Sequence, residues 1–142
     1  NMNDNSETVL LNLFKGTGTK GVAGIPPKRG RIIRPILSVT RDEIEAYLNK
    51  VRVDFITDSS NANIDYLRNK IRIDILPEIR STINPKVDKA LLKFSELMRG
   101  NNKALEEVLS QIQNKIFIEN NDSLELLINE NDNISNYLVN TA

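Results

Sequence analysis

Residues 58–72 read D-S-S-N-A-N-I-D-Y-L-R-N-K-I-R, and this stretch divides into a polar turn followed by a helix. The turn at 58–61 carries short polar side chains, which bond to nearby backbone groups and favour a bend. A helix is predicted over 64–75. Its apolar residues recur at helical spacing and form one face: Ile64, Leu67, Ile71 and Ile75.

Arg68 and Arg72 lie four residues apart in this helix, so both guanidinium groups project from one side, with Asn69 beside them. Two arginines on a rigid element next to a polar turn are suited to hold a phosphate or a developing anion. The alternative is that Arg68 pairs with Asp65 and Arg72 with another carboxylate, because paired charges on helices are common. Tyr66 is suited to stack on a base, although such residues more often pack.

The composition restricts the chemistry that the chain can perform. Its 142 residues suit one ordinary domain or parts of two. The absence of cysteine excludes thiolate chemistry, and the absence of histidine removes the commonest metal ligand and neutral-pH base. Carboxylates, lysine, arginine and backbone dipoles must therefore do the work. No run is apolar enough to cross a bilayer, so we expect no membrane partner. The absence of cysteine fits a reducing compartment, and we expect a cytoplasmic location.

The net charge is zero, but the charges are unevenly distributed. Every charged residue from 9 to 41 is basic: Lys15, Lys20, Lys28, Arg29, Arg31, Arg34 and Arg41. Every charged residue after Lys115 is acidic, which is typical of a solvated face. A basic stretch of this length favours a polyanion partner such as RNA, and the alternative is an ordinary basic loop.

The remaining segments predict a mostly helical chain. We expect a short helix over 7–14, with Asp4 near its start as a cap, and a strand over 31–33. T-R-D-E at 40–43 is a capping box that begins a scaffold helix.

The glycine pattern G-x-G-x-x-G at 16–21 is not interpreted as a dinucleotide site, because a helix rather than a strand precedes it. A long helix with a coiled-coil-like seam is predicted over 85–112, and Gly100 is a point where it bends or divides. A hairpin over 116–129 and a helix from about 133 follow.

Several motifs in register resemble those of the tRNA(Ile)-lysidine synthetases, bacterial enzymes of the PP-loop, or N-type ATP pyrophosphatase, superfamily. The similar segments are N-D-N-S-E-T at 3–8, K-G-T-G at 15–18, I-I-R-P-I-L at 32–37, D-S-S-N at 58–61, Y-L-R-N-K-I-R at 66–72 and I-L-P at 75–77. The resemblance is strong from residue 1 to about 85 and weakens after about 109.

The resemblance implies an α/β remnant, mostly helical, over 1–84, which would be the C-terminal part of a PP-loop catalytic domain. Residues 85–142 would form a long linking helix and the start of a small α+β domain that binds tRNA or serves as an accessory. The family's nucleotide loop, S-G-G-x-D-S, would precede residue 1. We therefore expect an excerpt that is inert alone and binds ATP weakly or not at all.

The activity that the resemblance implies is an ATP-dependent ligation on the wobble cytidine of an isoleucine tRNA. ATP adenylates the C2 carbonyl oxygen, and the ε-amine of free lysine then attacks C2 and expels AMP, which leaves lysidine. The implied cofactors are ATP and Mg²⁺, the implied partners are tRNA(Ile) and free lysine, and a homodimer is a further expectation.

The resemblance also implies roles for individual residues. The family motif has two acids, and Asn3 replaces the first of them. Asp4 alone would therefore contact magnesium or the lysine amine. Arg72, and next Arg68, would contact phosphate or the activated base. The residues expected to position them or to face RNA are Asn61, Asn69, Lys15, Gly16, Gly18, Lys28, Arg29, Arg31 and Arg34.

Three alternatives from other classes remain. The basic stretch also suits a non-catalytic RNA-binding module. Another PP-loop enzyme, such as a tRNA thiolase, would commonly need cysteines, which this chain lacks. The seam of the long helix suits a helical protein-interaction domain.

Overall fold

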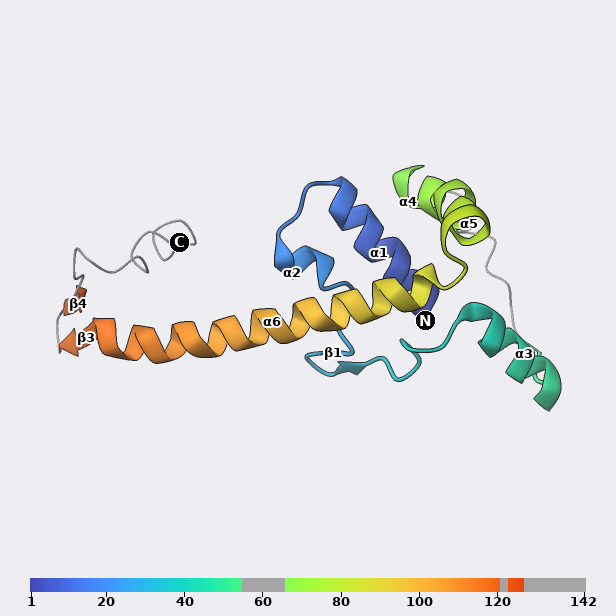
Figure 1. The fold of residues 1–142 in the computed structure, drawn as a ribbon. Helices are drawn as coiled ribbons and strands as arrows, with labels where there is room; N and C mark the ends of the chain where they lie inside the picture. Colours follow the sequence, from blue (N-terminus) through green and yellow to red (C-terminus); the bar gives the residue numbers. More distant parts are fainter. Residues whose placement is uncertain (55–65, 121–122, 127–142) are drawn as a thin grey trace. The chain divides into compact units, whose positions relative to one another are not determined.

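The computed structural model describes residues 1–54, 66–120 and 123–126, with side chains up to 112, and these residues are mostly helical (Figure 1). The chain divides into two compact units, Asn1–Asn102 and Lys103–Ala142. The expectation of a mostly helical chain is confirmed. The predicted domain boundary near residue 85 lies just before the helix α6 (Val87–Ile116), whereas the division between the two units falls within the sequence of that helix, after Asn102.

The first helix, α1 (Met2–Phe14), begins earlier than the predicted residue 7. Asn1 caps it, since the Asn1 side chain accepts from the backbone N–H of Asp4 and the Asp4 carboxylate bonds back to the Asn1 nitrogen. Polar residues at its start favour a turn in isolation. They are helical here because Asn5 and Ser6 are fully buried against other elements.

A continuous helical run follows the gap in the described residues. It consists of α4 (Tyr66–Lys70), the π-helical segment η2 (Ile71–Ile75), α5 (Leu76–Glu78) and the π-helical segment η3 (Ile79–Ile83). The predicted helix ended at residue 75, before Pro77. The run continues because it changes to i→i+5 hydrogen bonds, such as Leu76 N–H to the Ile71 carbonyl, which accommodate proline. The turn at 58–61 lies outside the described residues.

The core of the first unit forms where this run packs on α1. Leu10, Ile71 and Leu76 are its buried centre, and each fully buried aliphatic side chain of this kind contributes about 1.5–3 kcal/mol. The surrounding half-buried residues include Leu67 and Ile75, so the predicted apolar face packs inward from Leu67 onward, and Ile64 lies outside the described residues.

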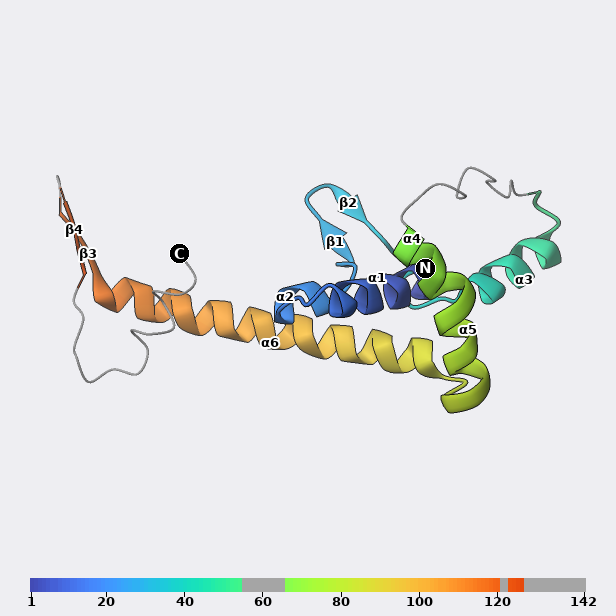
Figure 2. The ribbon, with the colours of Figure 1, turned by 90° about the horizontal axis from the view of Figure 1, so that it is seen from above.

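A short antiparallel hairpin pairs β1 (Lys28–Arg29) with β2 (Ile32–Ile33), and it extends away from the helices in the view of Figure 2. Gly30 lies in the turn with φ +59°, a left-handed conformation that favours glycine. A helix of four residues, α2 (Thr19–Val22), precedes it. The predicted strand is thus present, and its side chains are exposed.

The helix α3 (Arg41–Val51) begins at the predicted capping box, with Thr40 and Glu43 bonded reciprocally. Hydrogen bonds from the Thr40 backbone and hydroxyl lower the pKa of Glu43. The scaffold role predicted for this helix does not extend to burial, because none of its residues is buried and Tyr47 is 64% exposed.

The part of α6 that belongs to the first unit runs beside α1 in both views (Figures 1 and 2), and the helix is continuous through Gly100. Within the second unit, β3 (Phe117–Asn120) pairs antiparallel with β4 (Ser123–Leu126), which confirms the predicted hairpin. The helix predicted from about 133 lies outside the described residues. Among those that are described, no helix is long and apolar enough to span a membrane.

Candidate active site

A pocket of about 90 Å³ opens beside the first turn of α1. Residues from α1, the start of α3 and the helical run 66–83 line it: Asn1, Asn3, Asp4, Glu7, Arg41, Arg72, Leu76 and Arg80. The lining therefore combines three guanidinium groups with two carboxylates. Such a set can bind anionic oxygens and a cationic amine close together.

Glu7 is the anchor of this site, and its carboxylate is only 4% exposed. Its Oε1 accepts from Arg72 Nε at 2.7 Å and its Oε2 accepts from Arg72 Nη2 at 2.9 Å. Arg68 Nε donates to the same Oε2 at 3.0 Å. Hydrogen bonding to Glu7 outweighs burial and raises the pKa of Arg72 further, so this guanidinium is permanently charged and fixed.

Asp4 borders the same pocket. Its Oδ1 lies 3.8 Å from Arg72 Nη2, and its carboxylate is 38% exposed. Asn1 rather than Asp4 is the N-cap of α1, and Asp4, the third residue of the helix, completes the capping box and lines the pocket. The Asn3 amide accepts from the backbone N–H of Arg41 at 2.9 Å, which ties α3 to α1 at the pocket rim.

The carboxylates of the pocket fit only one kind of magnesium contact. The described residues contain no group of three side chains able to ligate a metal ion. Glu7 is occupied by two arginines, which leaves Asp4. A single carboxylate suits a magnesium ion carried by substrate phosphates, since Mg²⁺ is commonly bound by one or two carboxylates together with phosphates.

A second arginine of the pocket, Arg80, is also fixed by a carboxylate. Arg80 donates from Nε and Nη2 to the two oxygens of Asp88 at 2.8 and 3.0 Å. Burial would raise the pKa of Asp88, but hydrogen bonds from Arg80 and Ser6 outweigh it and lower the pKa. Sequence patterns carried no signal for this pair, because Arg80 and Asp88 belong to different elements.

The predicted catalytic residues come together only in part. Asp4 and Arg72 share the pocket, whereas Arg68 shares Glu7 but does not line the pocket. The predicted alternative, an ordinary ion pair, is present for Arg72 with Glu7. The proposed pairing of Arg68 with Asp65 lies outside the described residues, as does Asn61. Asn69 is half-buried on α4.

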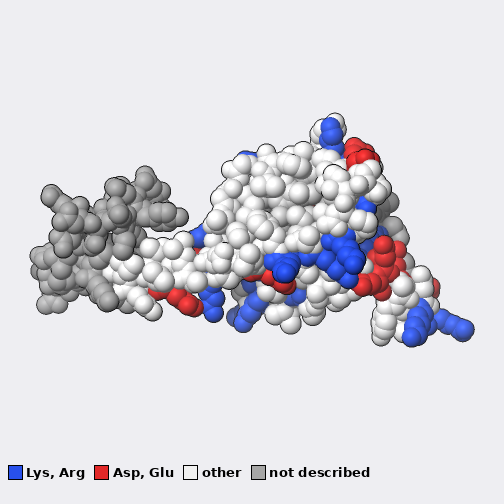
Figure 3. Space-filling model, in the orientation of Figure 1, with Lys and Arg blue, Asp and Glu red and all other residues white. Residues whose placement is uncertain are grey.

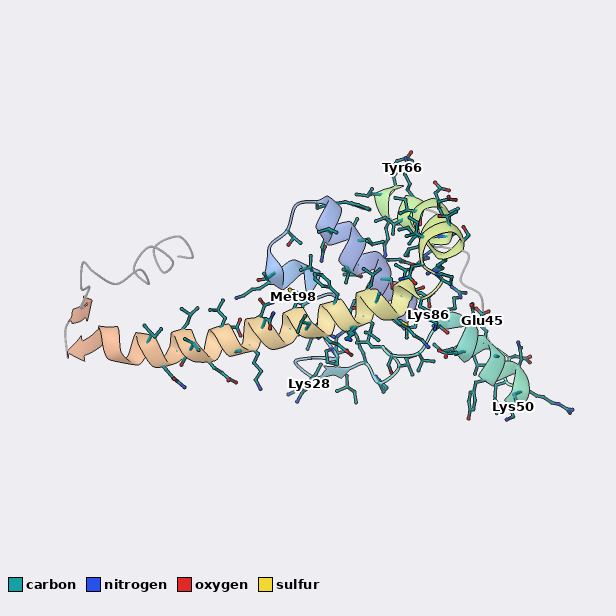
Figure 4. The ribbon with its side chains drawn as sticks, viewed as in Figure 1. Lys28, Glu45, Lys50, Tyr66, Lys86 and Met98 are labelled. Atoms are coloured by element: carbon teal, nitrogen blue, oxygen red, sulfur yellow. The ribbon has the colours of Figure 1, made fainter. Side chains whose placement is uncertain are left out.

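The predicted RNA-facing residues lie in two other places. Lys15, Gly16 and Gly18 form the exposed loop after α1, at the helix end opposite the pocket. The basic hairpin, which we define as Lys28, Arg29 and Arg31, is exposed, and Lys28 projects from it in Figure 4. Arg34 is half-buried and donates to the Pro26 carbonyl at 3.1 Å, so it braces the base of the hairpin.

The surface of the first unit carries mixed charges and an exposed tyrosine. Basic and acidic side chains lie next to one another around the N-terminal end of α6 on the face drawn in Figure 3. Tyr66 is 83% exposed within the described residues and points away from the helices in Figure 4, so it does not pack there.

Glu7 lines the pocket and holds two arginines, but sequence reasoning did not select it. Its only signal was its place in N-D-N-S-E-T, because a glutamate in a helix more often faces solvent.

The chain is similar to known proteins over most of its length. Residues 1–79 match the PP-loop domain family. The chain is 37% identical over 127 residues, 89% of its length, to a tRNA(Ile)-lysidine synthase of Bacteroides thetaiotaomicron, of which 30% is covered. It is 46% identical over 98 residues, 68% of its length, to one of Porphyromonas gingivalis, of which 21% is covered. A third such relative is from Clostridioides difficile, at 37% identity over 129 residues, with 85% of the chain and 28% of the relative covered. The chain thus spans less than a third of the length of these curated relatives.

Proposed function

Because the chain belongs to the PP-loop domain family, we propose that it is part of an ATP-dependent ligase that joins free lysine to C2 of the wobble cytidine of an isoleucine tRNA. The observation that supports this most is the position of Arg72. It lies in one pocket with Asp4, held there by Glu7, although the two motifs are far apart in sequence. The names of the relatives supply the substrate class.

The first step requires positive charge beside the phosphates. The C2 carbonyl oxygen of cytidine attacks the α-phosphorus of ATP, and pyrophosphate leaves. Fixed cationic donors stabilise the charge that develops on the oxygens. Arg72 is suited to this because Glu7 holds its Nε and Nη2 edge, which leaves its Nη1 group for a substrate oxygen. Magnesium bound to the nucleotide would supply further charge neutralisation.

The second step requires a neutral amine. The ε-nitrogen of lysine forms a bond to C2 while the bond from C2 to the AMP oxygen breaks, so the ammonium must first lose a proton. A carboxylate at hydrogen-bond distance from the ammonium can orient it and assist that loss. Asp4 is our candidate, because it is partly exposed at the pocket and lies near the arginine that we assign to the leaving AMP.

We propose that the basic hairpin contacts the tRNA backbone. Its three cations are exposed on an element that extends from the helices (Figure 2). Contacts of this kind position RNA without reading its sequence. The loop at Lys15, Gly16 and Gly18 is a second candidate surface for the same backbone. We also retain a homodimer and a cytoplasmic location as predictions.

The proposal is tested by lysidine formation in the complete protein that carries this chain. Radiolabelled lysine should become covalently attached to an isoleucine tRNA only when ATP, Mg²⁺ and tRNA are all present. Replacement of the wobble cytidine should abolish the product. Salt-dependent tRNA binding without any lysine transfer would instead support the RNA-binding module and contradict the ligase.

The chain alone should be inactive. The pocket is lined by arginines and Asp4. The family binds the nucleotide phosphates with a glycine-rich loop, S-G-G-x-D-S, and residues 1–142 do not contain this motif. We therefore expect calorimetry on residues 1–142 to show weak ATP binding or none. Tight, magnesium-dependent ATP binding by this segment would contradict that expectation.

A further inference from the structure

Two arginines of the pocket are held in the same way. A buried or nearly buried carboxylate binds each at its Nε and Nη2 edge: Glu7 binds Arg72, and Asp88 binds Arg80. Both guanidinium groups line the pocket, and their side chains are 36% and 31% exposed. A guanidinium carries five N–H donors in one plane, so two such bonds leave its Nη1 end available.

The remaining end of Arg80 is available to the pocket. Nη1 of Arg80 has no hydrogen-bond partner among residues 1–54 and 66–112. Asp88, whose side chain is only 12% exposed, fixes the opposite edge from α6. Arg80 is therefore a pre-positioned donor, which loses little conformational freedom when an anion binds.

We propose that Arg80 contacts the anionic oxygens of a substrate, and that Asp88 of α6 is the residue that positions it. The substrate oxygens are either the carboxylate of the amino acid or the phosphates of the nucleotide, which present the same chemistry to a guanidinium. This inference rests on the proposed function for the identity of the two substrates. It adds a residue outside the motif match, since Arg80 lies just beyond residues 1–79.

A consequence is that α6 contributes to substrate affinity. Asp88 lies in its first turn, and the Asp88–Arg80 pair connects that turn to the pocket. The buried hydrogen bond between Asn5 Nδ2 and Ser95 Oγ, at 3.1 Å, also joins α1 to α6 but is not at the pocket. Ser95 therefore provides a control for effects that arise only from the stability of the α1–α6 contact.

The experiment compares five forms of the complete protein: wild type, Arg80→Ala, Arg80→Lys, Asp88→Asn and Ser95→Ala. Steady-state kcat and KM are measured for lysine and for ATP separately, at saturating tRNA, and circular dichroism monitors folding. Arg80→Ala should raise the KM of one of the two substrates about 10- to 100-fold, the loss expected for charge-assisted hydrogen bonds. The substrate whose KM rises identifies the source of the anion.

The conservative variants separate positioning from folding. Arg80→Lys keeps the positive charge but lacks the planar, bidentate donors of a guanidinium, so it should raise the same KM. It also replaces Arg80→Ala in the comparison if that variant does not fold. Asp88→Asn should raise the same KM by a smaller factor. Ser95→Ala should leave both KM values within about twofold of wild type. Equal KM shifts in Ser95→Ala and Asp88→Asn, or unchanged KM values in folded Arg80→Lys, would overturn the inference.

Failure of the proposed function is distinguishable from failure of this inference. If the wild-type protein forms no lysidine, the ligase proposal fails, and calorimetric binding of lysine and of Mg-ATP to wild type and Arg80→Lys still tests the contact. Weaker binding of one of the two by Arg80→Lys supports it, and equal binding of both overturns it.

Discussion

Glu7→Gln is the substitution that most directly tests how the pocket is held together. The Glu7 carboxylate is nearly buried and accepts three charge-assisted hydrogen bonds, at 2.7, 2.9 and 3.0 Å, from two arginines. Glutamine preserves the size of the side chain but removes the charge and replaces one acceptor oxygen with an N–H₂ donor. That donor would face a guanidinium, which is also a donor.

The expected cost follows from these contacts. Hydrogen bonds to charged groups contribute about 1.5–3 kcal/mol each, so three give an upper bound of about 9 kcal/mol. The substituted amide would keep one acceptor oxygen, and the arginines are 32% and 36% exposed, so water can replace part of what they lose. We therefore expect a loss of about 2–4 kcal/mol in the free energy of unfolding, at or below the range for breaking a buried ion pair.

Urea unfolding of the complete protein measures this loss, with Glu107→Gln as the matched control. Glu107 pairs with Lys103 on α6 at 3.7 Å, and both side chains are well exposed. Such a surface pair contributes about 0–1 kcal/mol. If Glu7→Gln costs no more than Glu107→Gln, then Glu7 does not anchor the arginines, and the role that we assign to it is wrong.

Four further predictions concern other parts of the first unit. The pKa of Asp88 is lower in the folded than in the unfolded chain, so its pair with Arg80 adds stability above the unfolded pKa, and this stability is lost as the pH falls below about 4. Asp88→Asn should therefore flatten the acid limb of stability measured against pH, and an unchanged limb would refute the pairing. Gly24→Ala should destabilise by about 2–4 kcal/mol, because φ is +67° and the added Cβ would clash with Asn5 Oδ1. Gly100→Ala, with open space around it in α6, should instead stabilise by about 0.5–1 kcal/mol, and thermal unfolding that shows equal signs for the two variants would refute this. Neutralising the three cations of the basic hairpin should lower the slope of log K against log salt for tRNA binding by about 2–3, and an unchanged slope in filter binding would exclude the hairpin from the interface.

Much of the architecture was predictable because local signals agree with the packing. The capping box at Thr40 begins a helix as predicted, and the apolar spacing of the stretch after residue 66 packs on the core. The hairpin of the second unit was also predictable, since a polar turn separates two short apolar runs. The start of α1 was not predicted: polar residues fill its first turns, and Asn5 is buried there through a hydrogen bond to Ser95, which is distant in sequence. The continuation of the helical run past Pro77 was not predicted either, since π-helical hydrogen bonding has no sequence signature.

The sequence predicted which motif residues belong to the candidate site, but not the ion pairs that these residues form. Arg72 and Asp4 were identified from motif resemblance, and the structure brings them to one pocket. The carboxylates that hold the arginines were not identified, because ion pairs between distant segments depend on tertiary packing. The side-chain spacing of a single helix cannot reveal them.

Single-turnover lysidine formation by the complete protein carrying Arg72→Ala tests the central claim most directly. That claim is that the guanidinium fixed by Glu7 stabilises the nucleotide as it reacts on the tRNA base. With tRNA bound to saturation, we predict that the rate constant falls by about 100-fold or more, the loss typical of removing one fixed donor to a developing charge. A rate near that of the wild type, with a folded variant, would contradict this claim.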